Sequence, residues 1–426
     1  MTVESDKSHM SGRAKALVWI LRICIGAVFV ISGFAKADDI YGFIFKIEEY
    51  LDVWNLSYPR SLIFVGATAL SVMEFLLGLM LMLGCYRRTV VWLLLLMMVA
   101  MTPLTAYIYF VDPVPDCGCF GDFIVLSNGA TFLKNILITI GLVYLLLKNR
   151  MVDGLFGAYI QWLVTAISAA YILTIGMIGY FMQPLMDFRS FPVGSTLLTE
   201  ENDSEESDFE FIYEKNGEKK VFSVTELPDS SWTFVERKQI GQVAKDKTEL
   251  VIFNEGENIT SEVLASQGDQ LLILIPEYSR ADVSNTYLLN LLDNYIKSQG
   301  GSMMTLVTAD AQDIEEWKDL SMADYPVYYA EPTTLKEMAR GIMPAVYLKD
   351  GRIVWKRTLP SIDSDKFEQA EDTPGLMDSL AFDGPRYAKY LTFALFVILM
   401  MIFMLDRSGR LLAWSIKIRK KAQSLK

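Results

Sequence analysis

Six runs of predominantly apolar residues, each near the length that crosses a lipid bilayer, constrain this chain more than any other feature. A helix needs roughly 20 residues to cross the hydrocarbon core. The runs cover residues 17–35, 62–83, 90–110, 131–147, 159–182 and 391–405. With 52% hydrophobic residues and a mean hydropathy of +0.28, the chain is too apolar for an ordinary soluble protein. We therefore expect an α-helical membrane bundle with six transmembrane helices.

The distribution of Lys and Arg among the connecting segments predicts the orientation of these helices. Short cytoplasmic loops are enriched in both residues. Alternate segments hold Lys7, Arg13, Lys15, Arg87, Arg88, Lys148 and Arg150, and seven further Lys and Arg follow residue 405. The segments between them are richer in Asp and Glu. We therefore expect both termini in the cytoplasm and residues 183–385 outside the cytoplasmic (inner) membrane of a bacterium, with membrane lipid around the bundle.

The net charge of −12 divides unevenly along the chain. Residues 183–385 hold 38 acidic and 18 basic residues, whereas the remainder holds 13 acidic and 21 basic ones. The part outside the membrane is therefore strongly acidic. It carries no basic stripe interleaved with aromatic residues, which is the pattern typical of nucleic-acid binding. We expect no nucleic-acid partner.

Residues 183–385 alternate between short apolar runs and amphipathic segments, as in a mixed α/β domain. We expect strands at 250–253, 271–275, 303–307, 327–329, 345–348 and 353–356, and helices at 283–296, 314–320 and 334–340. Asn216-Gly217 and Asp350-Gly351 predict β-hairpins, because both central residues of such turns tolerate positive φ angles. The acidic, Ser-rich stretch at 200–210 predicts a solvated linker.

The order of these elements resembles thioredoxin. In that family a cis-proline precedes the last hairpin and faces a redox-active Cys-x-x-Cys, and Met343-Pro344 matches the position of this proline. The resemblance therefore implies that Pro344 helps to bind a client. The position of the thiols reads Pro276-Glu277-Tyr278-Ser279-Arg280, and residues 183–385 contain no cysteine. Without a thiolate there is no nucleophile for disulfide exchange. We expect a thioredoxin-like domain without thiol chemistry of its own; a different α/β topology is the alternative.

The first four spans, roughly residues 15–150, resemble the DoxX/MauE superfamily of four-helix membrane proteins. The resemblance depends on Arg22, Gly26, Phe29, the run Ser32-Gly33-Phe34-Ala35-Lys36, Glu74, Gly78, Gly84, Lys134 and Asn135. Its most specific element is the loop Asp116-Cys117-Gly118-Cys119-Phe120-Gly121-Asp122. The MauE resemblance implies a role in maturation or redox handling of exported proteins, alongside a thioredoxin-like partner.

Cys117 and Cys119 differ from the other two cysteines in their expected surroundings. Cys24 lies within the first span and Cys85 at a cytoplasmic turn, and both are interpreted as packing residues. Cys117 and Cys119 are expected on the oxidising side, where disulfides form. A Cys-x-Cys disulfide closes a small strained ring, and strained disulfides are reduced more readily. A redox pair is the leading interpretation; a structural pair and a soft-metal site, which would need further ligands, are the alternatives.

Polar residues inside the spans are functional candidates, because burial of ionisable groups in a membrane is costly. Arg22, Lys36, Glu74 and Asn135 form this set. A Glu74–Arg22 pair is one expectation. The alternative joins Glu74 to Lys36, through water or through snorkelling of the long lysine side chain. A pair that merely fixes helix packing explains the same residues.

These expectations combine into one domain plan. It places a DoxX/MauE-like four-span domain at 1–150, a fifth transmembrane helix at 151–182, a linker with a β-hairpin extension at 183–245, a thioredoxin-like domain at 246–370, a linker at 371–390, a sixth helix at 391–405 and a basic cytoplasmic tail at 406–426.

The leading function hypothesis is a membrane-anchored accessory or assembly factor, with a redox-capable Cys117/Cys119 loop and a domain that binds an envelope client. The alternative is a non-catalytic scaffold with a structural cysteine pair, and a transporter is less favoured because no inverted repeat is evident. No cofactor is predicted. A quinone-coupled disulfide generator relays electrons to a second thiol pair, whereas Cys24 and Cys85 are separated and on the other side. The electron partner would then be another protein, and the sequence leaves open whether the chain is itself an enzyme.

Overall fold

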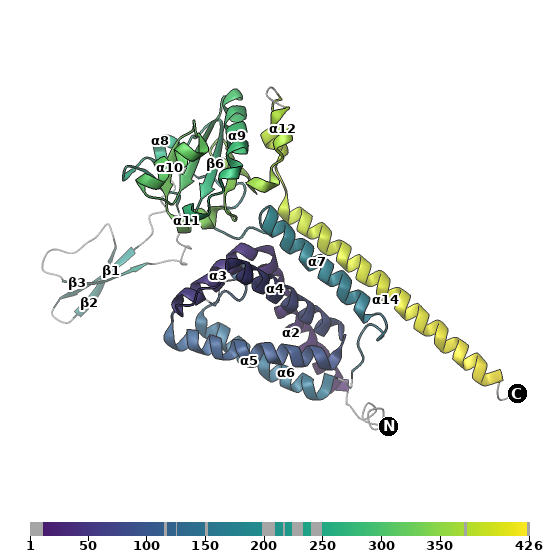
Figure 1. Ribbon diagram of the computed structural model, residues 1–426. Coiled ribbons are helices and arrows are strands. Elements are labelled where there is room, and N and C mark those ends of the chain that lie inside the picture. Colours follow the sequence, from purple (N-terminus) through teal and green to yellow (C-terminus); the bar gives the residue numbers. More distant parts are fainter. Residues whose placement is uncertain are drawn as a thin grey trace. The chain divides into compact units, whose positions relative to one another are not determined.

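A computed structural model describes residues 12–114, 117–124, 126–149, 152–197, 209–215, 218–223, 233–239, 249–369 and 373–423. The chain divides into two compact units (Figure 1). The helical unit comprises Met1–Phe188 and Phe382–Lys426, and the α/β unit comprises Arg189–Ala381.

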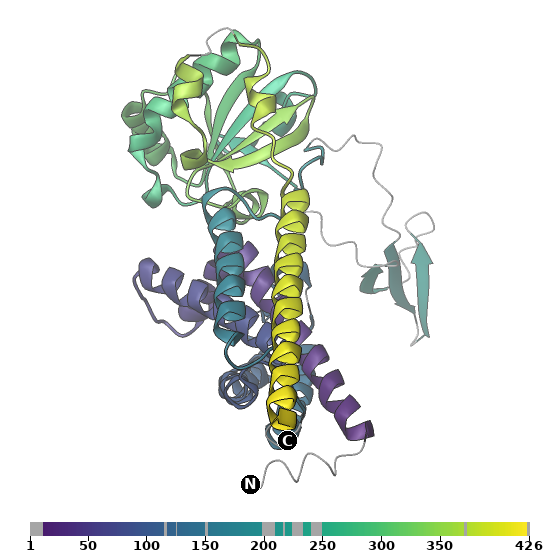
Figure 2. The same ribbon diagram turned by 90° about the vertical axis from the view of Figure 1, so that its right-hand side faces the viewer.

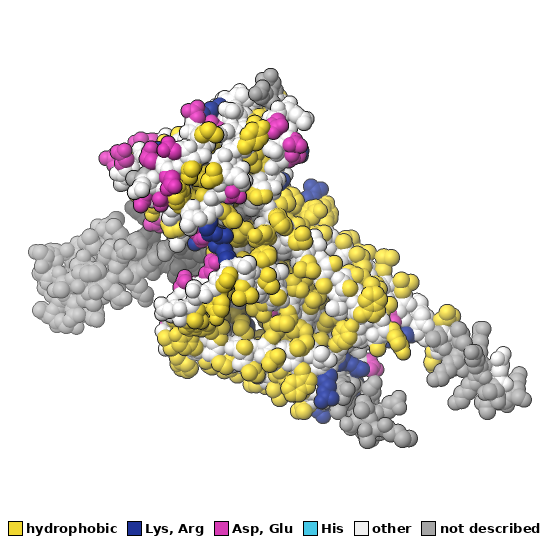
Figure 3. Space-filling model, in the orientation of Figure 1, with side chains coloured by type: hydrophobic (Ala, Val, Ile, Leu, Met, Phe, Trp, Pro, Cys, Tyr) yellow, Lys and Arg dark blue, Asp and Glu magenta, His cyan; other side chains and the backbone are white. Residues whose placement is uncertain are grey.

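The helical unit confirms the six expected spans, since six of its helices are long and apolar enough to cross a membrane. They are α2 (Gly12–Asp38), α4 (Arg60–Leu83), α5 (Arg87–Val111), α6 (Asn128–Lys148), α7 (Gln161–Phe181) and α14 (Gly384–Gln423). Hydrophobic side chains cover most of the face of this unit that is visible in Figure 3. The protein is a multi-pass membrane protein.

The sixth span is the longest of these helices, and its bounds differ most from those expected from the sequence. α14 has 40 residues and continues into the basic segment after residue 405, which the sequence analysis expected to be a tail outside the helix. At 1.5 Å per residue it is about 60 Å long, roughly twice the thickness of a hydrocarbon core. It lies beside α7 in both views (Figure 1, Figure 2), with the hydroxyl oxygens of Tyr171 and Thr392 2.8 Å apart.

Small residues hold α2 and α4 against each other. A Cβ atom added to Gly78 would lie 2.7 Å from the carbonyl oxygen of Gly26 and 2.7 Å from the amide nitrogen of Val30. Gly33 makes a similarly close approach to the backbone of Phe75. Glycines of this kind let helix backbones approach closely in a membrane, so α2 and α4 form the central seam of the bundle.

A helix that the sequence did not predict follows the first span. α3 (Ile40–Val53) begins after Asp39, whose carboxylate accepts a hydrogen bond of 2.9 Å from the amide of Gly42. It buries Ile40, Tyr41 and Ile44. The interpretation as an acidic loop missed it, because Glu48, Glu49 and Asp52 occupy the less buried part of an amphipathic helix.

The α/β unit is thioredoxin-like and contains a seven-stranded mixed sheet of order β10-β9-β6-β7-β8-β4-β5. Its strands are β4 (Ile252–Asn254), β5 (Glu257–Asn258), β6 (Asp269–Ile275), β7 (Ser302–Val307), β8 (Val327–Ala330), β9 (Pro344–Lys349) and β10 (Arg352–Thr358). β6, β7 and β8 are parallel, and β9 and β10 form an antiparallel hairpin beside β6. The turn residues Asp350 and Gly351 both have positive φ, as the sequence predicted.

Alternate residues of β6 face opposite sides of the sheet, which therefore has two apolar cores. Leu271, Ile273 and Ile275 pack with α9 (Thr286–Ser298), α10 (Ala311–Ser321), α12 (Ser364–Glu368) and α13 (Leu376–Ser379). Leu272 and Leu274 pack on the other side with α11 (Pro332–Met338) and with Leu264, which follows α8 (Thr260–Val263). The expected strands and helices of this domain are all present, with ends shifted by a few residues.

A separate three-stranded sheet precedes this domain. β1 (Phe209–Lys215) pairs with β2 (Glu218–Ser223), as the first hairpin predicted, and also with β3 (Thr233–Gln239), which the sequence analysis missed. The turn residues Asn216 and Gly217 and most of the expected acidic linker lie outside the described residues.

Candidate functional site

The two cysteines of the Cys-Gly-Cys loop lie side by side between α5 and the short 3₁₀ helix η1 (Gly121–Phe123). The sulfur atoms of Cys117 and Cys119 are 2.9 Å apart, and both residues are free thiols here. Gly118 has a φ of +65°, which L side chains rarely adopt. The left-handed glycine therefore folds the loop so that both thiols face each other.

Hydrogen bonds from two other helices fix the backbone of this loop. Tyr50 on α3 donates from its hydroxyl to the carbonyl oxygen of Cys117 over 3.0 Å. Ser32 on α2 lies 2.7 Å from the carbonyl oxygen of Cys119 and can donate to it. Sequence reasoning missed Tyr50, because α3 itself was not predicted. Ser32 belongs to the run of residues 32–36 that supported the family resemblance, but the sequence analysis assigned it no role.

An ion pair lies directly behind Ser32. Lys36 Nζ is 2.6 Å from Glu74 Oε2, and the two side chains are only 2% and 3% exposed. Ser32 Oγ lies 2.8 Å from the same carboxylate oxygen and 2.9 Å from Lys36 Nζ. Glu74 therefore pairs with Lys36 by direct contact, without the bridging water that sequence reasoning considered. The expected Glu74–Arg22 pair is wrong.

Arg22 has a different set of partners. It is fully buried, and its guanidinium donates to the side chain of Asn149 over 2.5 Å and to the carbonyl oxygens of Asn149 and Val152 over 2.9 and 2.8 Å. The positions of Arg22 in the first span and Glu74 in the second suggested that both lie at a similar depth in the membrane. The arginine instead reaches the segment between α6 and α7, where carbonyl oxygens at a helix C-terminus need donors.

Asn135 is buried, but its partner lies on α5 and is not a member of the ion pair. Its amide donates to Thr105 Oγ1 over 3.1 Å. The neighbouring Lys134 instead faces the cysteine loop, with its Nζ 4.5 Å from the centre of the Phe120 ring. Of the four polar residues predicted within the spans, Lys36 and Glu74 thus lie next to the loop, and Arg22 and Asn135 do not.

The two thiols differ in their acidity. The pKa of Cys119 is lowered to about 6, first by the hydrogen bond from Cys117 and then by Lys134 and Lys36, against the opposing effects of burial and Glu74. The pKa of Cys117 is raised, first by the hydrogen bond it shares with Cys119 and then by burial. Cys119 is also the more exposed of the two. The pair therefore offers one reactive thiolate and one protonated neighbour.

The other two cysteines lie apart from this loop. Cys85 is buried at the turn between α4 and α5, as expected of a packing residue, whereas Cys24 is exposed on the surface of α2. In the described part of the chain, no group of three His, Cys, Asp or Glu side chains is placed to hold a metal ion.

Pro344 opens β9 in the α/β unit, at the position that the thioredoxin resemblance predicted. The peptide bond before it is trans, because the described residues contain no cis peptide bond, and this corrects the expected cis geometry. The buried Met343 accepts a hydrogen bond of 3.3 Å at its sulfur from the amide of Asp282. Where the redox cysteines of a thioredoxin would lie, Glu277 instead pairs with Arg280 and Lys336 at 3.1 and 2.8 Å.

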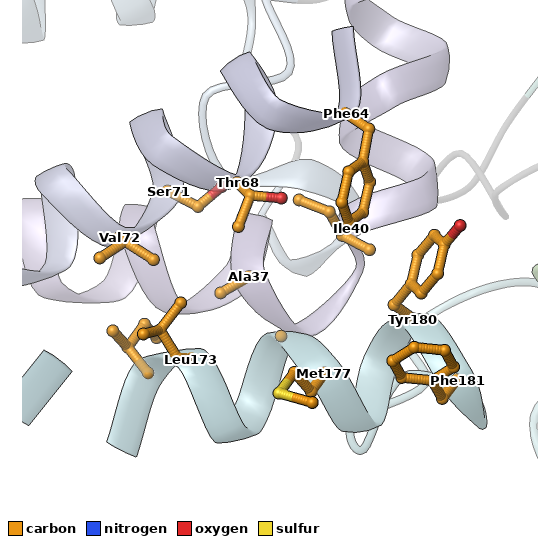
Figure 4. Close-up of a pocket in the computed structure, with 12 residues that line it drawn as sticks. Ala37, Ile40, Phe64, Thr68, Ser71, Val72, Leu173, Met177, Tyr180 and Phe181 are labelled. Carbon is orange, nitrogen blue, oxygen red and sulfur yellow. The ribbon is translucent and has the colours of Figure 1, made fainter. Parts of the chain in front are cut away.

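An apolar pocket of about 290 Å³ lies among α2, α3, α4 and α7 (Figure 4). Its lining is mostly aliphatic and aromatic, with hydroxyl groups on Thr68, Ser71 and Tyr180. Ser71 donates to the carbonyl oxygen of Ala67 over 2.8 Å, whereas Thr68 Oγ1 has no partner among the described residues. The pocket is therefore mostly lipophilic.

Comparison with known proteins matches separate parts of the chain to separate families. Residues 14–148 match the family described as Methylamine utilisation protein MauE. This part of the chain is MauE-like. Residues 207–245, which include the three-stranded sheet, match a family described as a domain of unknown function. No solved structure shows a significant match.

A curated relative extends the similarity. Protein TlpB of Flavobacterium psychrophilum is 23% identical over 189 residues, which are 44% of this chain and 51% of that protein. The chain thus spans about half the length of this relative. The six spans and the MauE-like region identify a multi-pass protein of the bacterial inner membrane with a thioredoxin-like domain near its C-terminus.

Proposed function

We propose that this MauE-like protein is a membrane-anchored accessory factor that exchanges disulfides with exported proteins through Cys117 and Cys119. The observation that supports it most is the asymmetric thiol pair. Two sulfur atoms 2.9 Å apart, one with a low pKa and the other protonated, match a nucleophile and a resolving thiol. The MauE-like region and the thioredoxin-like domain support a role in the maturation of envelope proteins.

The exchange needs no group beyond the thiols and a disulfide partner. The Cys119 thiolate attacks one sulfur of the partner disulfide, forms a mixed disulfide, and releases the other partner sulfur as a thiolate that takes up a proton. Cys117 then loses its proton and attacks the sulfur of Cys119, releasing the second partner thiolate. The loop is oxidised by two electrons and the partner is reduced by two, with both protons ending on the partner thiols. The reverse sequence oxidises a client.

The α/β domain has no cysteine and therefore takes no part in the exchange itself. Its role in this proposal is to bind the client. Val283 and Ile342 are exposed apolar residues next to the contact between Asp282 and Met343, beside the start of β9 at Pro344. Exposed apolar side chains at a strand end suit an extended polypeptide. This client-binding role of Pro344 and its surroundings is an inference from the fold.

Trapping of mixed disulfides tests the exchange. Cys117→Ser leaves the Cys119 nucleophile without its resolving thiol, so a partner should remain attached as a reductant-sensitive adduct on a non-reducing gel. Cys119→Ser should trap less, because the remaining Cys117 thiol has a raised pKa, and the double variant should trap nothing. Cys24→Ser is the matched control, since this thiol lies outside the loop. Absence of an adduct from both single variants would contradict the exchange.

A scaffold function is the second candidate, favoured by the absence of cysteine from the thioredoxin-like domain. In a scaffold the two thiols would serve only the structure of the loop. Protein amounts would then collapse in the Cys117→Ser/Cys119→Ser double variant. Under the exchange proposal they stay unchanged, because so short a loop gives little entropic stabilisation when closed.

A further inference from the structure

The cysteine loop faces charged side chains from four helices of the MauE-like domain. Lys36 on α2 and Lys134 on α6 favour the anionic form of Cys119, whereas Glu74 on α4 opposes it. Tyr50 on α3 contacts the loop through its hydroxyl. Lys46 on the same helix packs against Gly118 and pairs with Glu49 over 2.8 Å, so its charge has a partner of its own.

Three charged side chains act on the Cys119 thiol, and their charges do not balance while the thiol is neutral. Lys36 and Lys134 contribute two positive charges and Glu74 contributes one negative charge. A thiolate at Cys119 supplies the second negative charge and makes the group neutral. Because Lys36 and Glu74 are buried and Lys134 and Cys119 are half-buried, compensation of charge favours the thiolate, and this balance is lost when the loop is oxidised.

Lys36 is held in this position by three contacts. Its ammonium group donates to Glu74 over 2.6 Å and to Ser32 over 2.9 Å, and it lies 5.2 Å from the centre of the Phe43 ring. Ser32 in turn reaches the carbonyl oxygen of Cys119. The lysine is thus connected to the loop through one hydroxyl, and the same carboxylate oxygen contacts both Lys36 and Ser32.

We propose that Lys36 is a positioning cation that, together with Lys134, keeps Cys119 in its reactive anionic form, and that Glu74 limits how strongly Lys36 acts. This role rests on the proposed exchange at the same loop. It assigns opposite effects to the two members of one ion pair, which a purely structural pair would not have. Lys36 and Glu74 are positioning residues, since they act on Cys119 through their charge and through Ser32.

The rate of alkylation as a function of pH tests this assignment. The reduced full-length protein in detergent is treated with iodoacetamide, and modification of Cys119 is followed by peptide mass spectrometry. Lys36→Met should move the midpoint of the rate profile upward by about one pH unit, as expected when a nearby opposite charge is lost. Glu74→Gln should move it downward, because Lys36 then acts on Cys119 unopposed.

Two further variants keep the measurement decisive. Lys36→Arg retains the positive charge and should keep the midpoint close to that of the unmodified protein. Lys148→Met removes a lysine from the opposite end of α6 and should change nothing. Midpoints that move in the same direction for Lys36→Met and Glu74→Gln, or that do not move at all, would overturn the assignment. Mixed-disulfide trapping is read separately, so failure of the exchange and failure of the charge effect remain distinguishable.

Discussion

Lys36 and Glu74 form a direct ion pair of 2.6 Å between α2 and α4, in a seam where helix backbones are close enough to require glycine. Ser32 contacts both partners and also the backbone of Cys119. The pair therefore joins the central seam of the bundle to the loop that holds the thiols. We therefore expect a change in either residue to affect both stability and thiol reactivity through the same contacts.

Removal of the carboxylate should destabilise the bundle more than removal of the whole pair. Glu74→Leu leaves the buried Lys36 without a counter-charge, which typically costs about 3–5 kcal/mol. The Lys36→Met/Glu74→Leu double variant removes both charges and should recover much of this loss. Thermal denaturation in detergent, followed by size-exclusion chromatography, measures the difference. A double variant less stable than Glu74→Leu would contradict the expectation.

Arg22 should be needed for stability and not for thiol chemistry. Arg22→Leu removes the donors to Asn149 and Val152, and hydrogen bonds to a charged group contribute about 1.5–3 kcal/mol each. We expect a loss of about 3 kcal/mol or more of unfolding free energy, with an unchanged pH profile of Cys119 alkylation. Arg13→Leu is the matched control, because Arg13 is exposed on the same helix. Equal melting temperatures for the Arg22→Leu and Arg13→Leu proteins would refute the structural role.

Two glycines of α4 should respond in opposite ways to the same substitution. Gly78→Ala places a Cβ atom 2.7 Å from the backbone of Gly26 on α2, so the helices must separate. Gly66→Ala places its Cβ in open space and should stabilise the helix by roughly 0.5–1 kcal/mol. The apparent melting temperatures of the two variants give the comparison. Equal effects would mean that the α2–α4 contact is looser than described.

The pH dependence of thiol reactivity follows from the acidity of Cys119. With a pKa of about 6, the thiol is largely protonated below pH 6 and largely thiolate at pH 7. Alkylation of the reduced loop should therefore rise through a midpoint near pH 6 and level off above it. Cys117→Ala removes the hydrogen-bond donor that contributes most to the low pKa, so its midpoint should move upward. A midpoint above pH 8 in the unmodified protein would contradict the asymmetric pair.

The sequence was sufficient for the features that depend on local pattern. The long apolar runs located all six spans, and short apolar runs located the strands around β6. The sequence could not predict which buried charged residues pair with each other inside the bundle. Arg22 and Lys36 were both candidates for Glu74, and only the packing of α2 against α4 places Lys36 on the same side as the carboxylate. Tyr50 was hidden for a related reason, since acidic residues masked the amphipathic pattern of α3.

Basic side chains gather at one end of the helical unit and predict the orientation of the protein in the membrane. Arg22 and Arg87 both donate to the carbonyl oxygen of Val152, and Arg410 donates to that of Leu155. The segment between α6 and α7 thus collects basic residues from α2, α5 and α14 at one end of the helical unit. By the positive-inside rule this end faces the cytoplasm.

Labelling of single cysteines measures this orientation. In a protein without its native cysteines, Ser266→Cys in the α/β unit should react with a membrane-impermeant maleimide in intact spheroplasts. Ser408→Cys on α14, near Arg407 and Arg410, should react only after the membrane is opened. Both positions are exposed, so accessibility within the protein does not limit either reaction. Reversed labelling would place Cys117 and Cys119 on the reducing side, where a stable pool of disulfide substrates is absent, and would remove the basis for exchange.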